Sequence, residues 1–384
     1  MTKDDLTYDP FGPARASGGY SGDFNGEVMP VLTRWRDVRA AARDWQRFSN
    51  DGPGRVPVPA ETDIRSLRQL PIEIDPPAHG AYKDLVKDWF RRPMEDPILA
   101  ARIAAIVQDR VAAALSGDPV DVVQSISLPI QSHALAALFG LPEAEAEVWI
   151  GWGLHAFKSK GRNDPARADM LMRMIEGYVD AGRDGEQETF FDHLASARLN
   201  GRPLTREERL GFAHVAFAGG RDTLIHTMSG AIWHLARAPQ DLDRLRTEPE
   251  LLTRSTEEFV RFFAPLTHIG RICTREDEVA GLPRQPGERI ALCWAAANFD
   301  DTTFDDPLTL RIYRAPNPHV GFGAGDHACL GAAHARTVIR TLLSVLAVRV
   351  GRIEVLEAEP GTRDIGGIVR LQGFARLVLT FHPR

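Results

Sequence analysis

The sequence predicts a mainly α-helical fold with a minor β-sheet region. Over residues 35–251, apolar residues recur at spacings of three and four, which is the period of helices packed on a core. Residues 271–295 and 351–381 instead carry short alternating or β-branched runs, with turn residues such as Gly366-Gly367 between them. No linker-like stretch or charge block divides the chain, so we expect one domain over residues 1–384.

Proline and glycine divide the helical region into segments of ordinary helix length. The periodicity predicts helices over residues 37–48, 81–91 and 98–115. The longest segment begins at Thr205, where Thr205 and Glu208 have the spacing of a capping box, and it ends at Ala238 because Pro239 cannot continue a helix. We expect a single helix here of about 34 residues, or roughly 50 Å.

Composition and charge exclude several classes of protein. The 384 residues include 46 Lys and Arg against 52 Asp and Glu, a net charge of −6, whereas binding to nucleic acid needs a basic field. The first residues contain no apolar signal-like segment, and no run of about eighteen apolar residues could span a membrane. We therefore expect a cytoplasmic protein with neither nucleic-acid nor membrane partners.

The three cysteines differ in their surroundings. Cys273, Cys293 and Cys329 form no Cys-x-x-Cys pair, which argues against a disulfide framework and a four-thiolate metal site. Cys329 follows a glycine-rich loop (residues 321–325) and precedes an apolar helical segment that extends to about residue 348. Inward-turned backbone N–H groups and a helix N-terminus both favour a thiolate. The other two cysteines lie in strand-like stretches and are expected to be buried apolar side chains.

Four kinds of chemistry are compatible with Cys329. A nucleophilic cysteine would need His327 or His334 as its base, although neighbours two or five positions away are rarely placed for that role. A zinc site could use both histidines, Cys329 and His319, at spacings that match no familiar arrangement. Residues 323–328 imitate a dinucleotide fingerprint, but no convincing strand precedes them. The fourth possibility is ligation of haem iron by the thiolate.

A family resemblance favours the fourth possibility. The loop Phe322-Gly323-x-Gly325-x-His327-x-Cys329-x-Gly331, completed by Ala335-Arg336, resembles the haem-binding loop of the cytochromes P-450, the haem-thiolate monooxygenases. Other motifs stand in the order of that family, namely Asp75-Pro-Pro-x-His79, Gly219-Gly220-x-Asp222-Thr223, Glu258-x-x-Arg261 and Arg271. Together they cover nearly the whole chain. The resemblance implies a cytochrome P-450 fold, in which a triangular helical body surrounds a buried haem.

The resemblance also implies roles for single residues. It implies haem b with Cys329 as the thiolate ligand of the iron, and it places Phe322, Gly323 and Gly331 against the cofactor. The expected cationic partners of the haem propionates are His79, Lys83, Arg271 and His327. Lys83 stands where arginine is commoner, so that a point charge replaces a bidentate fork. Asp222 and Thr223 are expected to relay protons during oxygen activation.

Glu258 and Arg261 are expected to form a structural pair. They lie three residues apart in a helical stretch, so their side chains meet on one face. Such a pair contributes little when exposed, but at this position in the chain it resembles the buried clamp of the family. The usual third, basic partner is missing from residues 307–309, and Arg311 or Arg314 could replace it. A second departure is His334, which replaces the usual leucine.

The resemblance implies insertion of one oxygen atom from O2 into a small apolar organic molecule. NAD(P)H is expected to supply electrons through a separate reductase and a ferredoxin or flavodoxin, and we expect the protein to be a monomer. The basic stripe Lys83, Lys87 and Arg91 is a candidate docking surface for the electron carrier. Two other classes stay open: a haem enzyme driven by peroxide, in which Asp222 and Thr223 would be dispensable, and a haem-binding carrier without turnover.

The substrate is expected to contact the distal side of the haem. The candidate contact residues are Val215, Gly219, Gly220, Leu266, Thr267, His268, Ile269, Gln372 and Phe374. Their character is largely apolar. Thr267 and His268 are polar exceptions, which could bind a hydroxyl or carbonyl of the substrate.

Overall fold

The chain is organised as two compact units in the computed structural model, which describes residues 8–52, 54, 56, 67–154, 158–159, 162–186 and 188–384. Unit 1 contains the described residues up to Lys83, together with Glu257–Cys329 and Pro360–Gly373. Unit 2 contains Asp84–Thr256, Leu330–Glu359 and Phe374–Arg384. Each unit is thus assembled from distant parts of the sequence, and the expectation of one domain stays a prediction.

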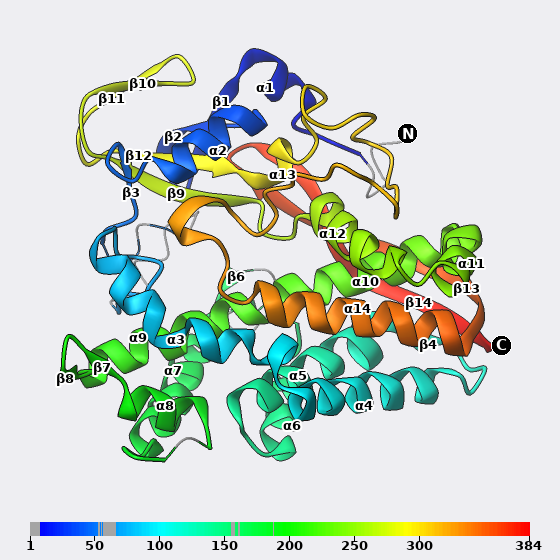
Figure 1. The fold of residues 1–384 in the computed structure, drawn as a ribbon. Helices are drawn as coiled ribbons and strands as arrows, with labels where there is room; N and C mark the ends of the chain where they lie inside the picture. Colours follow the sequence, from blue (N-terminus) through cyan, green and yellow to red (C-terminus); the bar gives the residue numbers. More distant parts are fainter. Residues whose placement is uncertain are drawn as a thin grey trace. The chain divides into compact units, whose positions relative to one another are not determined.

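Unit 1 is built on strands. They are β1 (Gly19–Phe24), β2 (Glu27–Leu32), β3 (Phe48–Ser49), β9 (His268–Cys273), β10 (Asp277–Val279), β11 (Leu282–Arg284) and β12 (Arg289–Cys293). Five of them form a sheet of order β1-β2-β12-β9-β3, in which β12 is parallel to β2 and antiparallel to β9 (Figure 1). β10 and β11 form a separate antiparallel hairpin. The turn between β1 and β2 is Asn25-Gly26, whose φ angles of 60° and 88° suit a two-residue hairpin turn.

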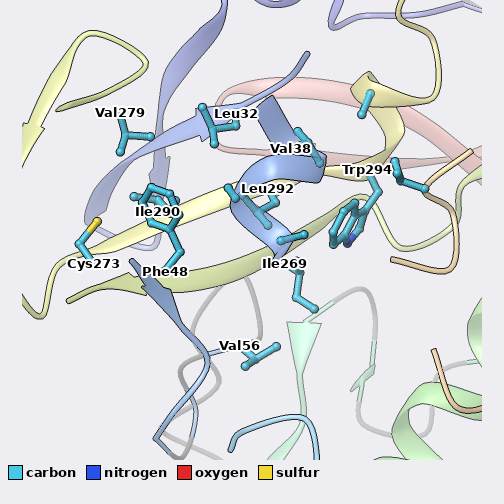
Figure 2. Packing of buried hydrophobic residues seen from close by; sticks show 14 residues of the cluster. Leu32, Val38, Phe48, Val56, Ile269, Cys273, Val279, Ile290, Leu292 and Trp294 are labelled. Atoms are coloured by element: carbon cyan, nitrogen blue, oxygen red, sulfur yellow. The ribbon is translucent and has the colours of Figure 1, made fainter. Parts of the chain in front are cut away.

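The helices of unit 1 are short, and most of them contact strands of this sheet. They are α1 (Gly12–Ser17), α2 (Trp35–Arg43), α13 (Trp294–Ala297) and the 3₁₀ turn η2 (Gly325–His327). Figure 2 shows Val38 of α2 among Leu32, Leu292 and Trp294, so that the apolar face of this helix closes the core. The helix predicted over residues 37–48 is shorter than expected, because α2 ends at Arg43 and the chain has become strand β3 by Phe48.

Two cysteines belong to the core of unit 1. Cys273 lies in the cluster of Figure 2, and Cys293 lies in a second cluster with Phe11 and Met29. Burial raises the pKa of Cys273 to about 11 and that of Cys293 to about 12. Both therefore stay protonated at neutral pH, which confirms that they are buried apolar side chains.

Unit 2 is mainly helical. Its helices are α4 (Pro97–Ala114), the π-helix η1 (Val123–Ser127), α5 (Leu128–Phe139), α6 (Glu143–Gly151), α7 (Pro165–Ala181), α8 (Phe190–Ser196), α9 (Arg206–Gly220), α10 (Asp222–Arg237), α11 (Pro239–Thr247) and α14 (Ala332–Arg349). Two more helices, α3 (Ala78–Glu95) and α12 (Leu251–Phe263), have one end in each unit. The helices predicted over residues 81–91 and 98–115 are confirmed as α3 and α4. Asp96 caps α4 by accepting hydrogen bonds from the N–H groups of Ile98 and Leu99.

The longest predicted helix is interrupted. Its start is correct, since Thr205 and Glu208 form the expected capping box, and its end before Pro239 is also correct. The single helix is nevertheless wrong: α9 ends at Gly220, α10 begins at Asp222, and Arg221 between them has φ −107° and ψ −79°. Glycine weakens a helix because it loses more backbone freedom on folding, and two consecutive glycines precede this break.

The remaining strands are few. They are β4 (Val120–Asp121), β5 (Lys158–Ser159), β6 (Arg162–Asn163), β7 (Arg198–Leu199), β8 (Arg202–Pro203), β13 (Val350–Ile365) and β14 (Ile368–Pro383). β13, β14 and β4 form a sheet in that order, and the Gly366-Gly367 turn lies between β13 and β14 as predicted. The mainly helical fold with minor sheets is confirmed. In the part of the chain that the structure describes, no helix is both long and apolar enough to cross a membrane.

Candidate active site

Cys329 lies in an exposed loop, whereas the other two cysteines are buried. Before it, Gly323 and Gly325 have φ angles of 73° and 75°, a region that side chains rarely adopt. A Cβ atom on Gly325 would also lie 3.0 Å from the carbonyl oxygen of Ala42, so α2 leaves little room for a side chain here. The Cys329 N–H donates to the carbonyl of Phe322 at 2.8 Å, which closes the loop around its glycines. The sequence therefore folds into a loop that presents a single thiol.

A histidine and the end of α12 support this loop. The Gly321 N–H donates to Nδ1 of His319 at 3.2 Å, so Nε2 carries the proton and donates to Glu257 at 3.0 Å. A Cβ atom on Gly321 would lie 2.8 Å from the side chain of Val260. The sequence indicated His319 only as a possible zinc ligand, and this contact was not predicted. A carboxylate partner 62 residues away could not be found from spacing alone.

Four cationic or ionisable side chains gather beside the loop. The rings of His79 and His327 lie 4.2 Å apart, and neither ring nitrogen of His327 has a hydrogen-bond partner among the described residues. Lys83 donates to the carbonyl of Asp326, one residue before His327. Arg271 is almost fully buried, and its guanidinium donates to the carbonyl of Gly270 at 2.7 Å. The four residues predicted to bind propionates thus belong to one group in unit 1.

The electrostatics of this group favour a bound anion. Burial lowers the pKa of His327 to about 2, and the charges of Arg271, His79 and Lys83 lower it further. Burial, followed by Lys83, also lowers the pKa of His79, and burial lowers that of Arg271 to about 10. A carboxylate bound among these groups would oppose each of these shifts, because it would stabilise the charged forms. The unpartnered nitrogens and the excess of positive charge therefore fit the propionates of a haem.

Glu258 and Arg261 form the predicted pair, and it is buried. Both side chains are 0% exposed, and the guanidinium donates to the two carboxylate oxygens at 2.7 and 2.8 Å. Arg261 also donates to the carbonyls of Asn298 and Pro307 at 2.8 and 2.9 Å, which ties the end of α12 to the irregular segment before the Cys329 loop. Buried charges are tolerated only with this degree of pairing.

The third partner of the pair is Arg314. Its Nε donates to both carboxylate oxygens of Glu258 at 3.1 and 3.0 Å, and the side chain is buried. Arg311 contributes only its backbone N–H to Glu258, because its guanidinium pairs with Asp305 and Asp306. Of the two candidates, Arg314 therefore supplies the second positive charge that pairs with Glu258.

The predicted acid and alcohol lie at the start of α10. Asp222 is the first residue of this helix, and both Asp222 and Thr223 are partly exposed. The Thr223 hydroxyl donates to the carbonyl of Gly219 at 3.1 Å, across the helix break. Its oxygen keeps lone pairs that can accept a further hydrogen bond. A Cβ atom on Gly220 would lie 3.3 Å from Leu135, whereas one on Gly219, which is itself exposed, would have no described atom within 4 Å.

The predicted substrate residues fall in both units. In unit 2, Val215 and Gly220 are partly exposed, and Phe374 is buried against Trp233, with ring centroids 5.8 Å apart. In unit 1, Ile269 is largely buried and Leu266 is 43% exposed.

The polar candidates Thr267, His268 and Gln372 of unit 1 already have internal partners. The Thr267 hydroxyl donates to the side-chain oxygen of Gln372 at 3.2 Å and accepts from buried Arg370 at 2.9 Å. Nε2 of His268 forms a hydrogen bond of 2.9 Å with the hydroxyl of Tyr20. Beside them is a cavity of about 20 Å³, room for a single water molecule. Among the residues that the structure describes, Nδ1 of His268 has no hydrogen-bond partner. Thr267 and His268 therefore serve the packing of unit 1, and substrate recognition through them has less support than the sequence suggested.

Other expectations lose support from the geometry. Lys87 pairs with Asp84 at 2.7 Å and Arg91 with Glu95 at 2.9 Å, so acidic neighbours neutralise much of the basic stripe. Residues 298–324, all described, contain no strand that could begin a dinucleotide site. Within the described residues, no three His, Cys, Asp or Glu side chains gather as metal ligands, which removes support for zinc.

His334 is buried in α14, and burial lowers its pKa to about 4. Neither of its ring nitrogens has a hydrogen-bond partner in the described part of the chain. Nothing in the structure explains why histidine stands at this position.

Two further residues, Arg221 and Gln131, were not predicted from the sequence. Arg221 is buried in the helix break and donates to the carbonyls of Trp149 and Gly153, and Gln131 of α5 donates to the carbonyl of Gly220. Arg221 is the one arginine between Arg209 and Arg237, in a stretch rich in apolar residues, and this was a usable signal because a buried charge requires partners. Gln131 gave no signal, since its partner lies 89 residues away.

An exposed cysteine loop, a cationic group suited to propionates and a mainly helical fold define a haem-thiolate protein, and the comparisons agree. A family profile described as Cytochrome P-450 matches residues 157–347. A solved structure titled as that of a carbohydrate active P-450 is 37% identical, with a TM-score of 0.95, and covers 100% of both chains. This chain belongs to the cytochrome P-450 family and has its fold.

Curated relatives agree with this assignment. A probable cytochrome P-450 127A1 of Sinorhizobium fredii is 28% identical over 91% of this chain and 83% of its own length. The linalool 8-monooxygenase of Pseudomonas putida is 29% identical over 74% of this chain and 71% of its own length. The protein is a haem-thiolate monooxygenase of small organic molecules, its cofactor is haem b with a cysteine thiolate ligand, and it uses O2 and electrons from redox partners.

Proposed function

We propose that Cys329 supplies the thiolate that holds the haem iron. The observation that carries this proposal is the exposed thiol in a glycine-bounded loop, next to the unpartnered nitrogens of His327. In the same proposal His79, Lys83, Arg271 and His327 bind the propionates, and Phe322, Gly323 and Gly331 contact the cofactor. Bound haem supplies the iron chemistry that activates oxygen.

Asp222 and Thr223 are proposed to deliver protons to the oxygen-binding site. Thr223 commits its hydroxyl hydrogen to Gly219, so its oxygen can accept a hydrogen bond and hold a water or a proton donor in place. Asp222 is partly exposed and can exchange protons with solvent. The break between α9 and α10 supports this role, because it leaves a helix carbonyl for the hydroxyl to bind.

The proposed substrate is a small apolar molecule. Support comes from the apolar character of Val215, Leu266, Ile269 and Phe374, and from a relative that is named for the terpenoid linalool. A carbohydrate is a second candidate, because the 37% identical structure is described as carbohydrate active. The two classes require different surfaces, since sugar hydroxyl groups need polar partners throughout the site.

The proposed electron donor is a ferredoxin, or a flavodoxin, that an NAD(P)H-dependent reductase reduces. This choice rests on the family's need for redox partners rather than on the basic stripe, whose ion pairs reduce its charge. We propose the cytoplasm as the site of action because NAD(P)H is available there, and we propose a monomeric enzyme.

Reconstitution tests this function. The purified protein, a generic ferredoxin with its reductase, NADPH and O2 are incubated with terpenoids, steroids, fatty acids, aromatic compounds and monosaccharides. We expect at least one compound to shift the spin state of the ferric protein and to give a product that carries one added oxygen atom. A spin shift with sugars alone would favour the second substrate class. Turnover with peroxide but not with NADPH would contradict the proposed electron path, and no turnover under any condition would indicate a carrier.

Thr223→Ala tests the proposed proton delivery. With a substrate from the panel, the variant should still consume NADPH while product falls and hydrogen peroxide rises, because the hydroxyl that positions the proton donor is absent. General acid–base contributions of this kind are worth about 100-fold or more in rate. Product per NADPH is the measurement, and Thr227→Ala is the control, since Thr227 also bonds a helix carbonyl, that of Thr223, from a buried position. Equal coupling in the wild type and Thr223→Ala would remove Thr223 from the relay.

A further inference from the structure

The break between α9 and α10 has more partners than a simple helix kink needs. Two carbonyl groups near the break are used by side chains: that of Gly219 accepts from the Thr223 hydroxyl, and that of Gly220 accepts from Gln131 of α5. Side chains that satisfy backbone groups hold a break in one conformation. The backbone of Arg221, which lies between the two helices, is therefore held by contacts from α10 and from α5.

The side chain of Arg221 connects the break to α6. It is only 7% exposed, and one guanidinium nitrogen donates to the carbonyls of Trp149 and Gly153 at the C-terminal end of that helix. The guanidinium carbon lies 5.9 Å from the ring centre of Trp152. All of these contacts lie within unit 2. One side chain thus contacts three residues over the last turn of α6 and just beyond it.

Electrostatics strengthen this connection. The last carbonyl groups of a helix lack partners within it and carry partial negative charge, so a cation there is favourable. Burial lowers the pKa of Arg221 to about 10, which leaves the guanidinium charged at neutral pH. A buried charge is strongly destabilising when it loses its partners. The end of α6 and the break are therefore expected to hold one relative arrangement as long as both hydrogen bonds form.

We propose that Arg221 is a positioning residue: by binding the end of α6, it holds the helix break in the arrangement in which Asp222 and Thr223 can deliver protons. This inference rests on the proposed role of the acid and the alcohol, and it adds a residue that does not touch the reacting atoms. Displacement of α6 would remove the partners of Arg221 and release the residue that immediately precedes Asp222. Efficient use of electrons is therefore coupled to the position of α6.

Arg221→Met tests the proposal, and the chain offers a matched control. Arg209 lies on α9, and its guanidinium donates to the carbonyl of Val179 near the end of α7, away from the break. Arg209→Met therefore removes the same kind of contact between an arginine and a helix end. Both haem-loaded variants are compared with the wild type by product and hydrogen peroxide per NADPH, and by amide hydrogen exchange over residues 146–154.

For Arg221→Met we expect product per NADPH to fall by roughly tenfold, as hydrogen bonds from a charged donor correspond to that factor or more in an equilibrium. Exchange at the end of α6 should become faster in the same variant. Arg209→Met should leave both measurements near wild type. Unchanged coupling or unchanged exchange in Arg221→Met would overturn the proposal, as would equal losses in the two variants.

Two further variants complete the design. If Arg221→Met does not fold, Arg221→Lys replaces it, because lysine keeps the charge but not the planar fork and should give a smaller loss in both measurements. Wild-type values in Arg221→Lys would then overturn the need for the fork. Thr223→Ala separates this inference from the proposed function. If that variant stays coupled, the proton role fails, whereas exchange at the end of α6 still tests the contact of Arg221 by itself.

Discussion

Cys329→Ser should remove the thiolate-type absorption band that the wild-type protein, loaded with haem and reduced, gives with carbon monoxide. A serine hydroxyl does not ionise near neutral pH, whereas a cysteine thiol has a pKa of about 8.5 that positive surroundings lower. The variant would have no anionic ligand and no electron donation from sulfur, which promotes cleavage of the O–O bond. Product formation with NADPH and the redox partners should therefore fall below detection. Haem content per chain and the spectrum with carbon monoxide are the measurements.

The control uses the other cysteines. Cys273→Ala and Cys293→Ala change buried side chains whose thiols remain protonated at neutral pH, so both variants should keep the spectrum of the wild type. Their expected effect is a modest loss of stability, since each removes a small group from a packed cluster. A thiolate-type spectrum in Cys329→Ser would contradict our assignment of the ligand, and its loss in either control would point to another sulfur.

The loop before Cys329 was predictable because its signals are local. The positive φ angles of Gly323 and Gly325, and the position of Cys329 after them, belong to one short loop. A loop of this kind is determined by the residue types within it, since only glycine adopts such angles at little cost. A local signal was also present for the β1–β2 hairpin, which we did not predict. Asn25-Gly26 is a strong hairpin signal and lies between these two strands.

Long-range contacts were not predictable from the sequence. Arg311 and Arg314 lie in the same irregular segment, and only the folded chain shows that Arg314 reaches Glu258. His268 could equally have faced a substrate, but it bonds Tyr20, which is 248 residues away. In both cases the sequence contains the right residue types, and tertiary packing decides which partner each one finds.

The helix break shows the same limit in a different form. Helical periodicity continues through Gly219, Gly220 and Arg221, so period alone indicates one helix. The interruption depends on groups from other elements: the side chain of Gln131 donates to the carbonyl of Gly220, and backbone carbonyls at the end of α6 accept from Arg221. A local signal for weakness was present in the glycine pair, but the position and geometry of the break follow from contacts between helices.

Glu258→Gln should have the largest effect on stability. The Glu258 carboxylate accepts hydrogen bonds from Arg261, Arg314 and Asn317, and it is the charged partner of two buried guanidinium groups. Glutamine keeps the shape but loses the charge, and its NH2 group would face donors. Removal of one partner from a buried ion pair costs about 3–5 kcal/mol, a large part of the roughly 5–15 kcal/mol that stabilises a typical domain. We expect poor haem retention and a large decrease in the urea midpoint of unfolding.

The matched control is Glu248→Gln. Glu248 also accepts two hydrogen bonds from one arginine, Arg244 at 2.8 and 2.9 Å, but this pair is on the surface. Solvent screens such a pair, so its loss should leave the urea midpoint and the haem content close to wild type. The two variants therefore make the same chemical change in a buried and an exposed arginine–glutamate pair. If Glu258→Gln were as stable as Glu248→Gln and bound as much haem, the buried pair would not be needed to hold α12 to the segment before the Cys329 loop.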